Sequence, residues 1–138
     1  MTASLEIVRN VYASFRQGDI HGVLANFGED CEVDFAGPER IPFAGKYKGA
    51  RGMGEAIKRF TETCDIIEFS PDEFHADGDF VTVLGHEHCR CKATGREWQT
   101  PLIETFVVRD SKIRSFRCLY DTARVADAYA PAPATAPR

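Results

Sequence analysis

The chain has 138 residues with a formal net charge of −4, and 43% of them are hydrophobic, which fits one soluble domain with a single core. The absence of a basic excess argues against nucleic acid as a partner, and no apolar run approaches the roughly 18 residues that a membrane span needs. No signal peptide is expected, and five Cys without regular spacing favour reduced thiols, so we expect a cytoplasmic protein without a membrane partner.

The first part of the chain is predicted to hold three helices and one strand. A helix that ends at Gly18 is followed by a short one that ends at Gly28, because glycine favours helix ends. Residues 31–35 alternate like a strand, and residues 36–49 contain three Gly and two Pro, which is typical of a long loop. A third helix ends near Cys64. The inner positions of the three helices are Leu5, Val8, Tyr12, Phe15, Ile20, Val23, Leu24, Phe27, Met53, Ile57, Phe60 and Cys64.

After Cys64 the apolar pattern changes to a period of two and predicts four strands, at about 65–75, 79–92, 96–109 and 112–121. A few helical residues are expected after Asp121. Residues 130–138 form a Pro/Ala segment that is expected to be disordered, which leaves residues 1–129 as one domain. Helices followed by a meander of long strands predict an α+β fold, in which a curved antiparallel sheet wraps around the helices.

Five segments resemble the nuclear transport factor 2-like superfamily, in particular its SnoaL-like polyketide cyclase-like and ketosteroid isomerase-like proteins. They are Tyr12–Ile20, Phe27–Val33, Phe43–Gly49, Phe74–Gly85 and Lys112–Thr122. The resemblance implies a cone-shaped, cystatin-like α+β domain with an apolar pocket, and usually a homodimer formed through the outer face of the sheet. These segments are turns and caps, so they indicate a fold rather than one activity.

The steroid isomerases of this superfamily use a Tyr on the first helix, a carboxylate base on the first strand and a neutral acid deep in the sheet. In an alignment without gaps, the helix Tyr falls on Val11, with Tyr12 one residue away and on a different face. The strand base falls on Phe35, next to Asp34, and only the neutral acid is matched, by Glu104. Two of the three isomerase residues are therefore unmatched, which argues against steroid isomerisation.

The hairpin near Thr94 and Gly95 predicts which acids face inward. A two-residue turn there would place Glu87 opposite Leu102. Since side chains alternate along a strand, Glu87 and Glu104 would then share the inner apolar face as diagonal neighbours. A bulge at Pro101 would reverse the faces and turn Glu87 outward.

The same alternation separates the residues of a tempting metal motif. His86 and His88 point to one face of the strand and Cys89 and Cys91 to the other, so one tetrahedral zinc ion cannot bind all four. No metal ion is therefore expected. A site made by the two His and a third ligand stays open, and a bulge at Pro101 would turn both His inward.

Two carboxylic acids in an apolar cavity are costly to ionise together, so at least one should have a raised pKa. We hypothesise that Glu104 donates a hydrogen bond to a carbonyl group and that Glu87 takes a proton. Alternatively, one acid pairs with an Arg, such as Arg117, or reaches solvent. Asp121 is a further candidate base, or else the cap of a short helix. The residues expected to contact the ligand are Tyr12, Phe15, Phe35, Phe60, Trp98, Leu102, Phe106, Phe116, Cys118 and Tyr120, although Tyr12 and Phe15 are also explained as core.

The chain has no Gly-rich phosphate loop, no Gly-x-Ser-x-Gly elbow and no interpretable Cys–His pair, which argues against nucleotide use and covalent acyl chemistry. We therefore expect a small hydrophobic, carbonyl-bearing ligand and no cofactor. Two functions stay open. One is an acid/base enzyme of the isomerase, cyclase, dehydratase or hydrolase type, and the other is a non-catalytic ligand-binding or dimerisation module.

Overall fold

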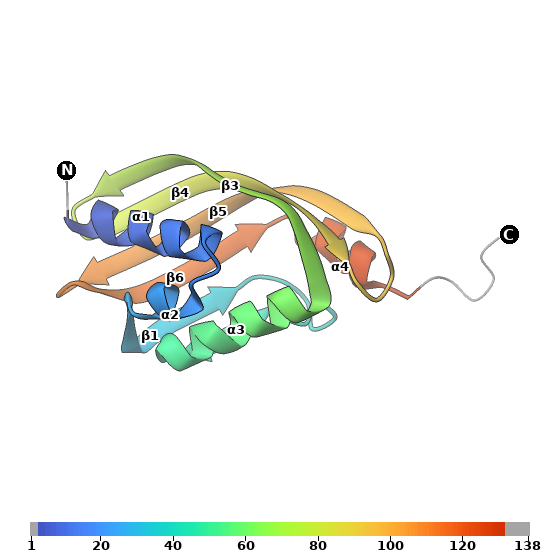
Figure 1. The fold of residues 1–138 in the computed structure, drawn as a ribbon, viewed down its shortest axis with the longest axis horizontal. Helices are drawn as coiled ribbons and strands as arrows, with labels where there is room; N and C mark the ends of the chain where they lie inside the picture. Colours follow the sequence, from blue (N-terminus) through green and yellow to red (C-terminus); the bar gives the residue numbers. More distant parts are fainter. Residues whose placement is uncertain (1–2, 132–138) are drawn as a thin grey trace, which may run out of the picture.

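A computed structural model describes residues 3–131, which form four helices and six strands (Figure 1). The helices are α1 (Ala3–Arg16), α2 (Ile20–Leu24), α3 (Gly49–Thr63) and α4 (Thr122–Tyr129). The strands are β1 (Phe27–Phe35), β2 (Gly45–Lys48), β3 (Cys64–Asp77), β4 (Phe80–Cys91), β5 (Glu97–Arg109) and β6 (Lys112–Tyr120). Apart from Ala130 and Pro131, the segment predicted to be disordered lies outside the described residues.

The six strands form one curved sheet in the order β2-β1-β6-β5-β4-β3. Neighbouring strands are antiparallel, except that β1 runs parallel to β6. Figure 1 shows α1, α2 and α3 on one side of the sheet, with α4 at the far end of the long strands. The predicted α+β class, with a curved sheet around N-terminal helices, is confirmed.

Local chemistry explains where α2 and α3 begin. Asp19 caps α2, since its carboxylate accepts a 2.9 Å hydrogen bond from the Gly22 amide. Gly49 opens α3 with a positive φ of 74°, and a Cβ there would lie 2.3 Å from the Glu29 carbonyl oxygen. This close approach brings α3 against β1 and forms one side of the space under the sheet.

Two predicted elements differ from the structure. The second helix ends at Leu24, and Phe27 begins β1, where it is opposite Ile113 of β6. The predicted loop over residues 36–49 contains the short strand β2, which pairs with the end of β1. Both errors come from Gly and Pro, which mark breaks in the chain but do not exclude a strand of four residues between them.

The β4–β5 hairpin has a longer turn than predicted. The Cys91 amide donates a 2.8 Å hydrogen bond to the Arg96 carbonyl, so four residues form the turn, and Gly95 adopts a φ of 76°. The register is therefore shifted by two residues, and Glu87 lies opposite Thr100 instead of Leu102. An even shift preserves the faces of both strands, so the predicted inward side chains still point inward.

Pro101 does not cause a bulge in this hairpin. The register of β4 and β5 is continuous around it, with Pro101 opposite His86. The pairing of β5 with β6 begins only at Leu102, which lies opposite Tyr120. Pro101 is therefore beyond the end of β6, where its missing amide hydrogen breaks no bond to that strand.

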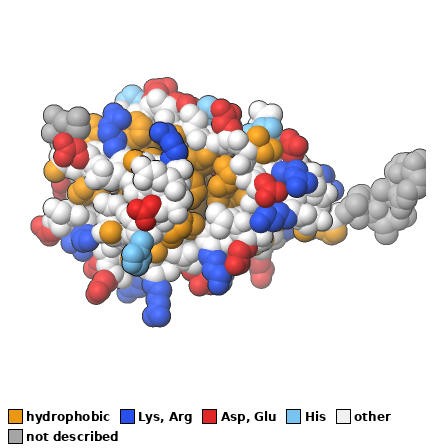
Figure 2. All heavy atoms as spheres, viewed as in Figure 1, with side chains coloured by type: hydrophobic (Ala, Val, Ile, Leu, Met, Phe, Trp, Pro, Cys, Tyr) orange, Lys and Arg blue, Asp and Glu red, His pale blue; other side chains and the backbone are white. Residues whose placement is uncertain are grey.

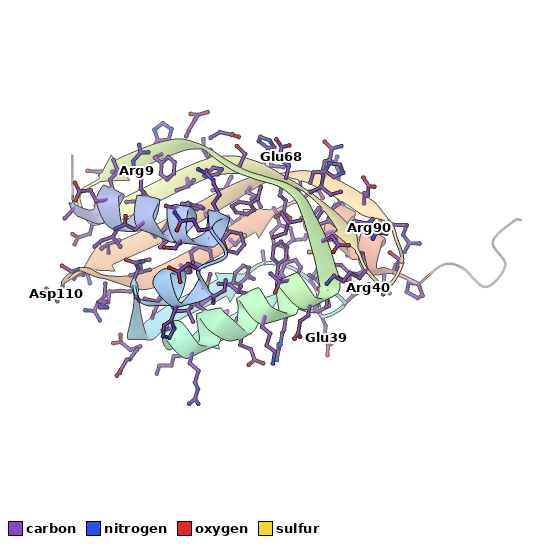
Figure 3. All side chains as sticks on the ribbon, viewed as in Figure 1. Arg9, Glu39, Arg40, Glu68, Arg90 and Asp110 are labelled. Atoms are coloured by element: carbon purple, nitrogen blue, oxygen red, sulfur yellow. The ribbon has the colours of Figure 1, made fainter. Side chains whose placement is uncertain are left out.

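Two groups of buried apolar residues fill the molecule. The larger lies between the sheet and α1–α3, and the smaller one, which we call the α4 core, contains Ile41, Phe43, Cys64, Cys89, Cys91, Trp98, Val125 and Ala128. Figure 3 shows side chains filling the space between sheet and helices, whereas the labelled Arg9, Glu68 and Arg90 lie on the outside. Among the described residues, no helix is long and apolar enough to cross a membrane.

Candidate functional site

An apolar cavity of about 70 Å³ lies between the inner face of the sheet and α1–α3. In Figure 2, hydrophobic side chains are visible in a hollow between α1, α3 and β3. Phe15 of α1, Phe60 of α3 and Phe69 of β3 line the cavity and are half-buried. Its wall consists of Val11, Tyr12, Phe15, Val23, Phe35, Phe43, Met53, Ala56, Ile57, Phe60, Phe69, Glu87, Leu102, Glu104, Phe106, Phe116, Cys118 and Tyr120. Two acids, and no Lys, Arg or His, belong to this wall.

Glu104 projects from β5 into the cavity and is only 8% exposed. The Tyr12 hydroxyl on α1 donates a 2.5 Å hydrogen bond to its Oε1 atom. The Cys118 thiol, directly opposite on β6, also hydrogen-bonds to this carboxyl group. Burial raises the pKa of Glu104 above its ordinary value, and these two donors only partly oppose the shift. A raised pKa favours the neutral acid, which has a proton to donate.

Glu87 projects from β4 into the same cavity and is 5% exposed. The indole nitrogen of Trp98 donates a 2.8 Å hydrogen bond to its Oε2 atom. Burial raises the pKa of Glu87 from 4.5 to about 7, the indole N–H opposes this shift, and the nearby Glu104 adds to it. Glu87 therefore changes protonation state close to neutral pH.

The two acids share one cavity but are not diagonal neighbours, as the hairpin prediction had placed them. Glu104 lies opposite Val83, four residues along β4 from Glu87, which corresponds to roughly 13 Å of strand. The error follows from the longer turn. Each acid is instead held by its own aromatic donor, Tyr12 or Trp98, on a separate part of the cavity wall.

No cation neutralises either acid within residues 3–131. The ion pairs of this part of the chain all lie at partly or fully exposed side chains and involve neither Glu87 nor Glu104. Arg117, the predicted alternative partner of Glu104, is exposed between the buried Phe116 and Cys118 of β6. Its side chain therefore lies on the outer face of the sheet.

Most residues expected to contact a ligand do line the cavity. The exception is Trp98, which lies in the α4 core behind the wall and donates a hydrogen bond to Glu87 of the wall. Sequence reasoning did not name Val11, Val23, Phe43, Met53, Ala56, Ile57 and Phe69 as ligand contacts, although Val23, Met53 and Ile57 were predicted to face inward. The helical spacing of Met53, Ile57 and Phe60 predicted the inner face of α3, and the same signal could have added Ala56 to it.

Tyr12 corrects the comparison with the steroid isomerases. It was predicted to lie on a different face of the helix from the isomerase Tyr, yet both Val11 and Tyr12 are buried and line the cavity. Asp34, by contrast, is half-buried outside the wall, and Phe35 is in it. The site therefore has a Tyr and a deep acid, while its second acid comes from β4 and not from the first strand.

Asp121 has a structural partner at the start of α4. Its carboxylate accepts a hydrogen bond of 3.1 Å from the Arg124 amide and so caps the helix, as the alternative interpretation of the sequence held. Asp121 is not part of the cavity wall. A catalytic role for Asp121 stays a prediction, and the two buried acids are the better candidates.

The His residues of β4 are engaged with surface carboxylates. His86 lies 2.7 Å from Asp72 and 3.4 Å from Glu68, and His88 lies 2.6 Å from Glu97. In the part of the chain that the structure describes, no group of three or more His, Cys, Asp or Glu has an arrangement that could hold a metal ion.

Comparisons with known proteins agree with this architecture. An NTF2-like protein from Burkholderia xenovorans is 31% identical and has a TM-score of 0.84, with 93% of this chain and 96% of that chain covered. TerC, co-crystallised with polyporic acid, is 22% identical with a TM-score of 0.82, with 93% of this chain and 98% of that one covered. A candidate polyketide cyclase from Pseudomonas putida is 21% identical with a TM-score of 0.71, with 94% and 99% covered.

The two structures with lower identity show the fold alone, and no curated protein matches the sequence significantly. The family profile of the SnoaL-like domain, however, matches residues 8–116, which is most of the chain. The protein therefore belongs to the SnoaL-like domain family and has the nuclear transport factor 2-like fold.

Proposed function

We propose that the protein binds a small apolar, carbonyl-bearing molecule in the cavity and catalyses cofactor-free acid/base chemistry on it. One observation carries the proposal: two buried carboxylic acids project into one apolar cavity, without a cation beside them among the described residues. Burying such groups costs free energy, and strongly shifted acids in a cavity are typical of sites that transfer protons. Solved structures with this fold include a candidate polyketide cyclase and a candidate isomerase, which supports the reaction class.

Glu87 is the proposed base. A pKa of about 7 leaves roughly half of this group ionised at neutral pH, which suits proton abstraction. The carboxylate takes the proton from a carbon next to the carbonyl group. The electron pair of the broken C–H bond forms a carbon–carbon double bond, and the π pair of the C=O bond moves to the oxygen. Returning the proton to another carbon completes an isomerisation, and expelling a leaving group completes an elimination.

Glu104 is the proposed donor to the carbonyl oxygen, and the hydrogen bond from Tyr12 holds it in place. Negative charge develops on this oxygen in the transition state, and hydrogen-bond donors already in place lower the barrier. Glu104 lines the cavity, and its raised pKa favours the neutral acid, which has a proton to donate to the carbonyl oxygen. Tyr12 donates its one hydroxyl hydrogen to Oε1 of Glu104, so Oε2 is the oxygen of Glu104 available to donate the acid proton.

The size of the cavity limits the ligand. A volume of about 70 Å³ is far below the roughly 300–1,000 Å³ of pockets that enclose drug-sized molecules. Phe15, Phe60 and Phe69 are only half-buried on the wall, so their side chains are the ones expected to move when a ligand enters. A flat molecule of one or two rings is the first candidate.

The test uses 2-tetralone, a two-ring ketone with acidic hydrogens beside its carbonyl group. We expect the protein to bind it and to accelerate deuterium incorporation from D₂O, followed by proton NMR. Glu87→Gln should bind the ketone with little change and lose the exchange, while Glu104→Gln should slow it. Glu62→Gln, an exposed residue on α3, is the control and should match the wild type. Absence of binding by 2-tetralone and by polyporic acid would contradict the proposal.

A non-catalytic module is the second candidate function. Ile103 of β5 and Leu119 of β6 lie directly opposite each other on the outer sheet face and are 41% and 44% exposed. Exposed apolar side chains that adjoin one another are typical of interaction surfaces, and we propose that this face forms a homodimer. Binding of the ketone without any exchange in the test above would favour this module over the enzyme.

A further inference from the structure

We propose that Trp98 is a positioning residue, whose indole N–H holds Oε2 of Glu87 so that Oε1 is the oxygen presented to the cavity. The contact is a 2.8 Å hydrogen bond between two buried side chains of adjacent strands. Trp98 does not line the cavity, so it acts on a ligand only through Glu87. Its value for catalysis rests on the function proposed above, whereas its effect on Glu87 does not.

The chemistry of the indole group decides where the Glu87 proton sits. Indole nitrogen is a donor only and accepts no hydrogen bond. While it donates to Oε2, this oxygen is the less basic of the two, so Oε1 is favoured as the oxygen that takes up the proton. Glu87 lines the cavity, so the proton is collected and returned on the side where a ligand would lie.

Several contacts of the α4 core, and not one neighbour alone, keep the indole ring in this position. The Tyr129 ring of α4 lies 5.5 Å from the Trp98 ring, centroid to centroid, and the Tyr129 hydroxyl is 2.8 Å from the Thr63 hydroxyl at the end of α3. The Thr94 hydroxyl, in the turn before Trp98, donates a 2.6 Å hydrogen bond to the Ala128 carbonyl of α4. The α4 core thus holds Trp98 between α4 and β4.

If the Trp98 ring only filled space in the core, it would need no N–H group facing Glu87. The hydrogen bond from Trp98 favours the ionised form of Glu87, and it opposes the burial that favours the neutral form. Without the donor, Glu87 would stay protonated at neutral pH and would be a poorer base. Position and proton affinity of Glu87 therefore depend on the same contact.

The first experiment is Trp98→Phe, which keeps an aromatic ring and removes the donor. Carbon-13 NMR of labelled Glu side chains, with the Glu87 signal assigned from Glu87→Gln, gives the titration midpoint. We expect the midpoint to rise by about one to two pH units relative to the wild type, as for the loss of one hydrogen bond to a charged group. An unchanged midpoint would overturn the proposal.

The matched control is Tyr129→Leu, which removes the ring packed on Trp98 and leaves the indole donor in place. If the N–H group is responsible, this variant keeps the wild-type midpoint. A rise equal to that of Trp98→Phe would show that packing alone sets the titration of Glu87, and the positioning role would be wrong.

A second measurement needs no substitution of Trp98 and stays valid if that variant fails to fold. The chain has one Trp, so a nitrogen-15 Trp label gives a single indole signal. We expect this signal to shift with the same midpoint as the Glu87 carbon, and the shift to vanish in Glu87→Gln. An indole signal that does not shift as Glu87 titrates would contradict the proposed contact between the two side chains. Neither measurement uses a ligand, so failure of the ketone test and failure of this inference are separate results.

Discussion

The hydroxyl of Tyr12 donates a 2.5 Å hydrogen bond to Oε1 of Glu104, so that α1 is joined to β5 between residues 92 positions apart in the sequence. The bond lies inside the apolar cavity, where a hydrogen bond is stronger than in water and a lost partner is costly. Burial and the adjoining Glu104 raise the pKa of Tyr12, which keeps the phenol protonated and able to donate. This contact therefore contributes to stability and to the proposed chemistry at once.

Tyr12→Phe is expected to lower the free energy of unfolding by about 1–3 kcal/mol near neutral pH, because Glu104 loses a donor in a buried site. In a Glu104→Leu background, where no carboxyl group needs the donor, the same substitution should cost much less. Urea unfolding of the two single variants and the double variant measures the difference. Additive effects would show that the two side chains are not coupled.

Glu87 makes stability depend on pH with a definite sign. Its pKa is about 7 in the folded protein and 4.5 ordinarily, so between these values the unfolded chain has lost a proton that the folded chain keeps. The contribution of Glu87 to stability therefore falls as the pH rises from 4.5 to 7 and stays low above that range.

Glu87→Gln removes this pH-dependent penalty. Relative to the wild type, we expect the variant to gain up to about 3 kcal/mol at pH 8 and almost nothing from this source at pH 4.5. Urea unfolding at the two pH values gives the comparison, and the exposed Glu62→Gln should show no such trend. A stability difference that is the same at both pH values would contradict the raised pKa.

The alternation of residues after Cys64 was sufficient to predict the long strands and the inner faces of β4 and β5. The face on which a side chain lies depends only on whether its position along the strand is odd or even. An error of two residues in the turn does not change this. The register could not be predicted, because Thr94 and Gly95 suit both a two-residue and a four-residue turn. The distance between Glu87 and Glu104 depends on this register and was therefore wrong.

The contact between Tyr12 and Glu104 could not be predicted from the sequence either, for a different reason. An alignment without gaps assigns one helix position to the site, but the apolar face of α1 is wide enough for Val11 and Tyr12 to line the same cavity. Which of two adjacent residues reaches Glu104 depends on how the helix lies over the sheet. Periodicity within the helix contains no information about that placement.

Trp98 offers a direct optical reading of Glu87. Because it is the single Trp and donates to a carboxyl group that titrates near neutral pH, its fluorescence should change with a midpoint of about pH 7. Excitation at a wavelength that only Trp absorbs isolates the signal. In Glu87→Gln the emission should stay constant over the same range. If the wild-type emission also stays constant, Glu87 does not titrate in this pH range.

The proposed homodimer can be tested on the outer sheet face. Ile103→Lys puts a charge into the apolar pair with Leu119 and should halve the mass measured by light scattering after gel filtration. Ile67→Lys is the control, since Ile67 is also exposed but lies on β3, at the edge of the sheet. A wild-type protein that is monomeric at micromolar concentration would rule out this assembly.

Phe69 is the aromatic residue of β3 at the cavity, where its ring lies 6.3 Å from that of Tyr12 and 5.4 Å from that of Phe15. Phe69→Ala should enlarge the cavity toward the hollow in Figure 2 and lower stability by about 1–3 kcal/mol, less than for a fully buried Phe. The larger space should strengthen binding of a three-ring ketone more than binding of 2-tetralone, as calorimetry of both ligands would show. Phe80→Ala, on the exposed outer face, should change neither affinity. Equal effects of the two substitutions would mean that the ligand does not enter beside Phe69.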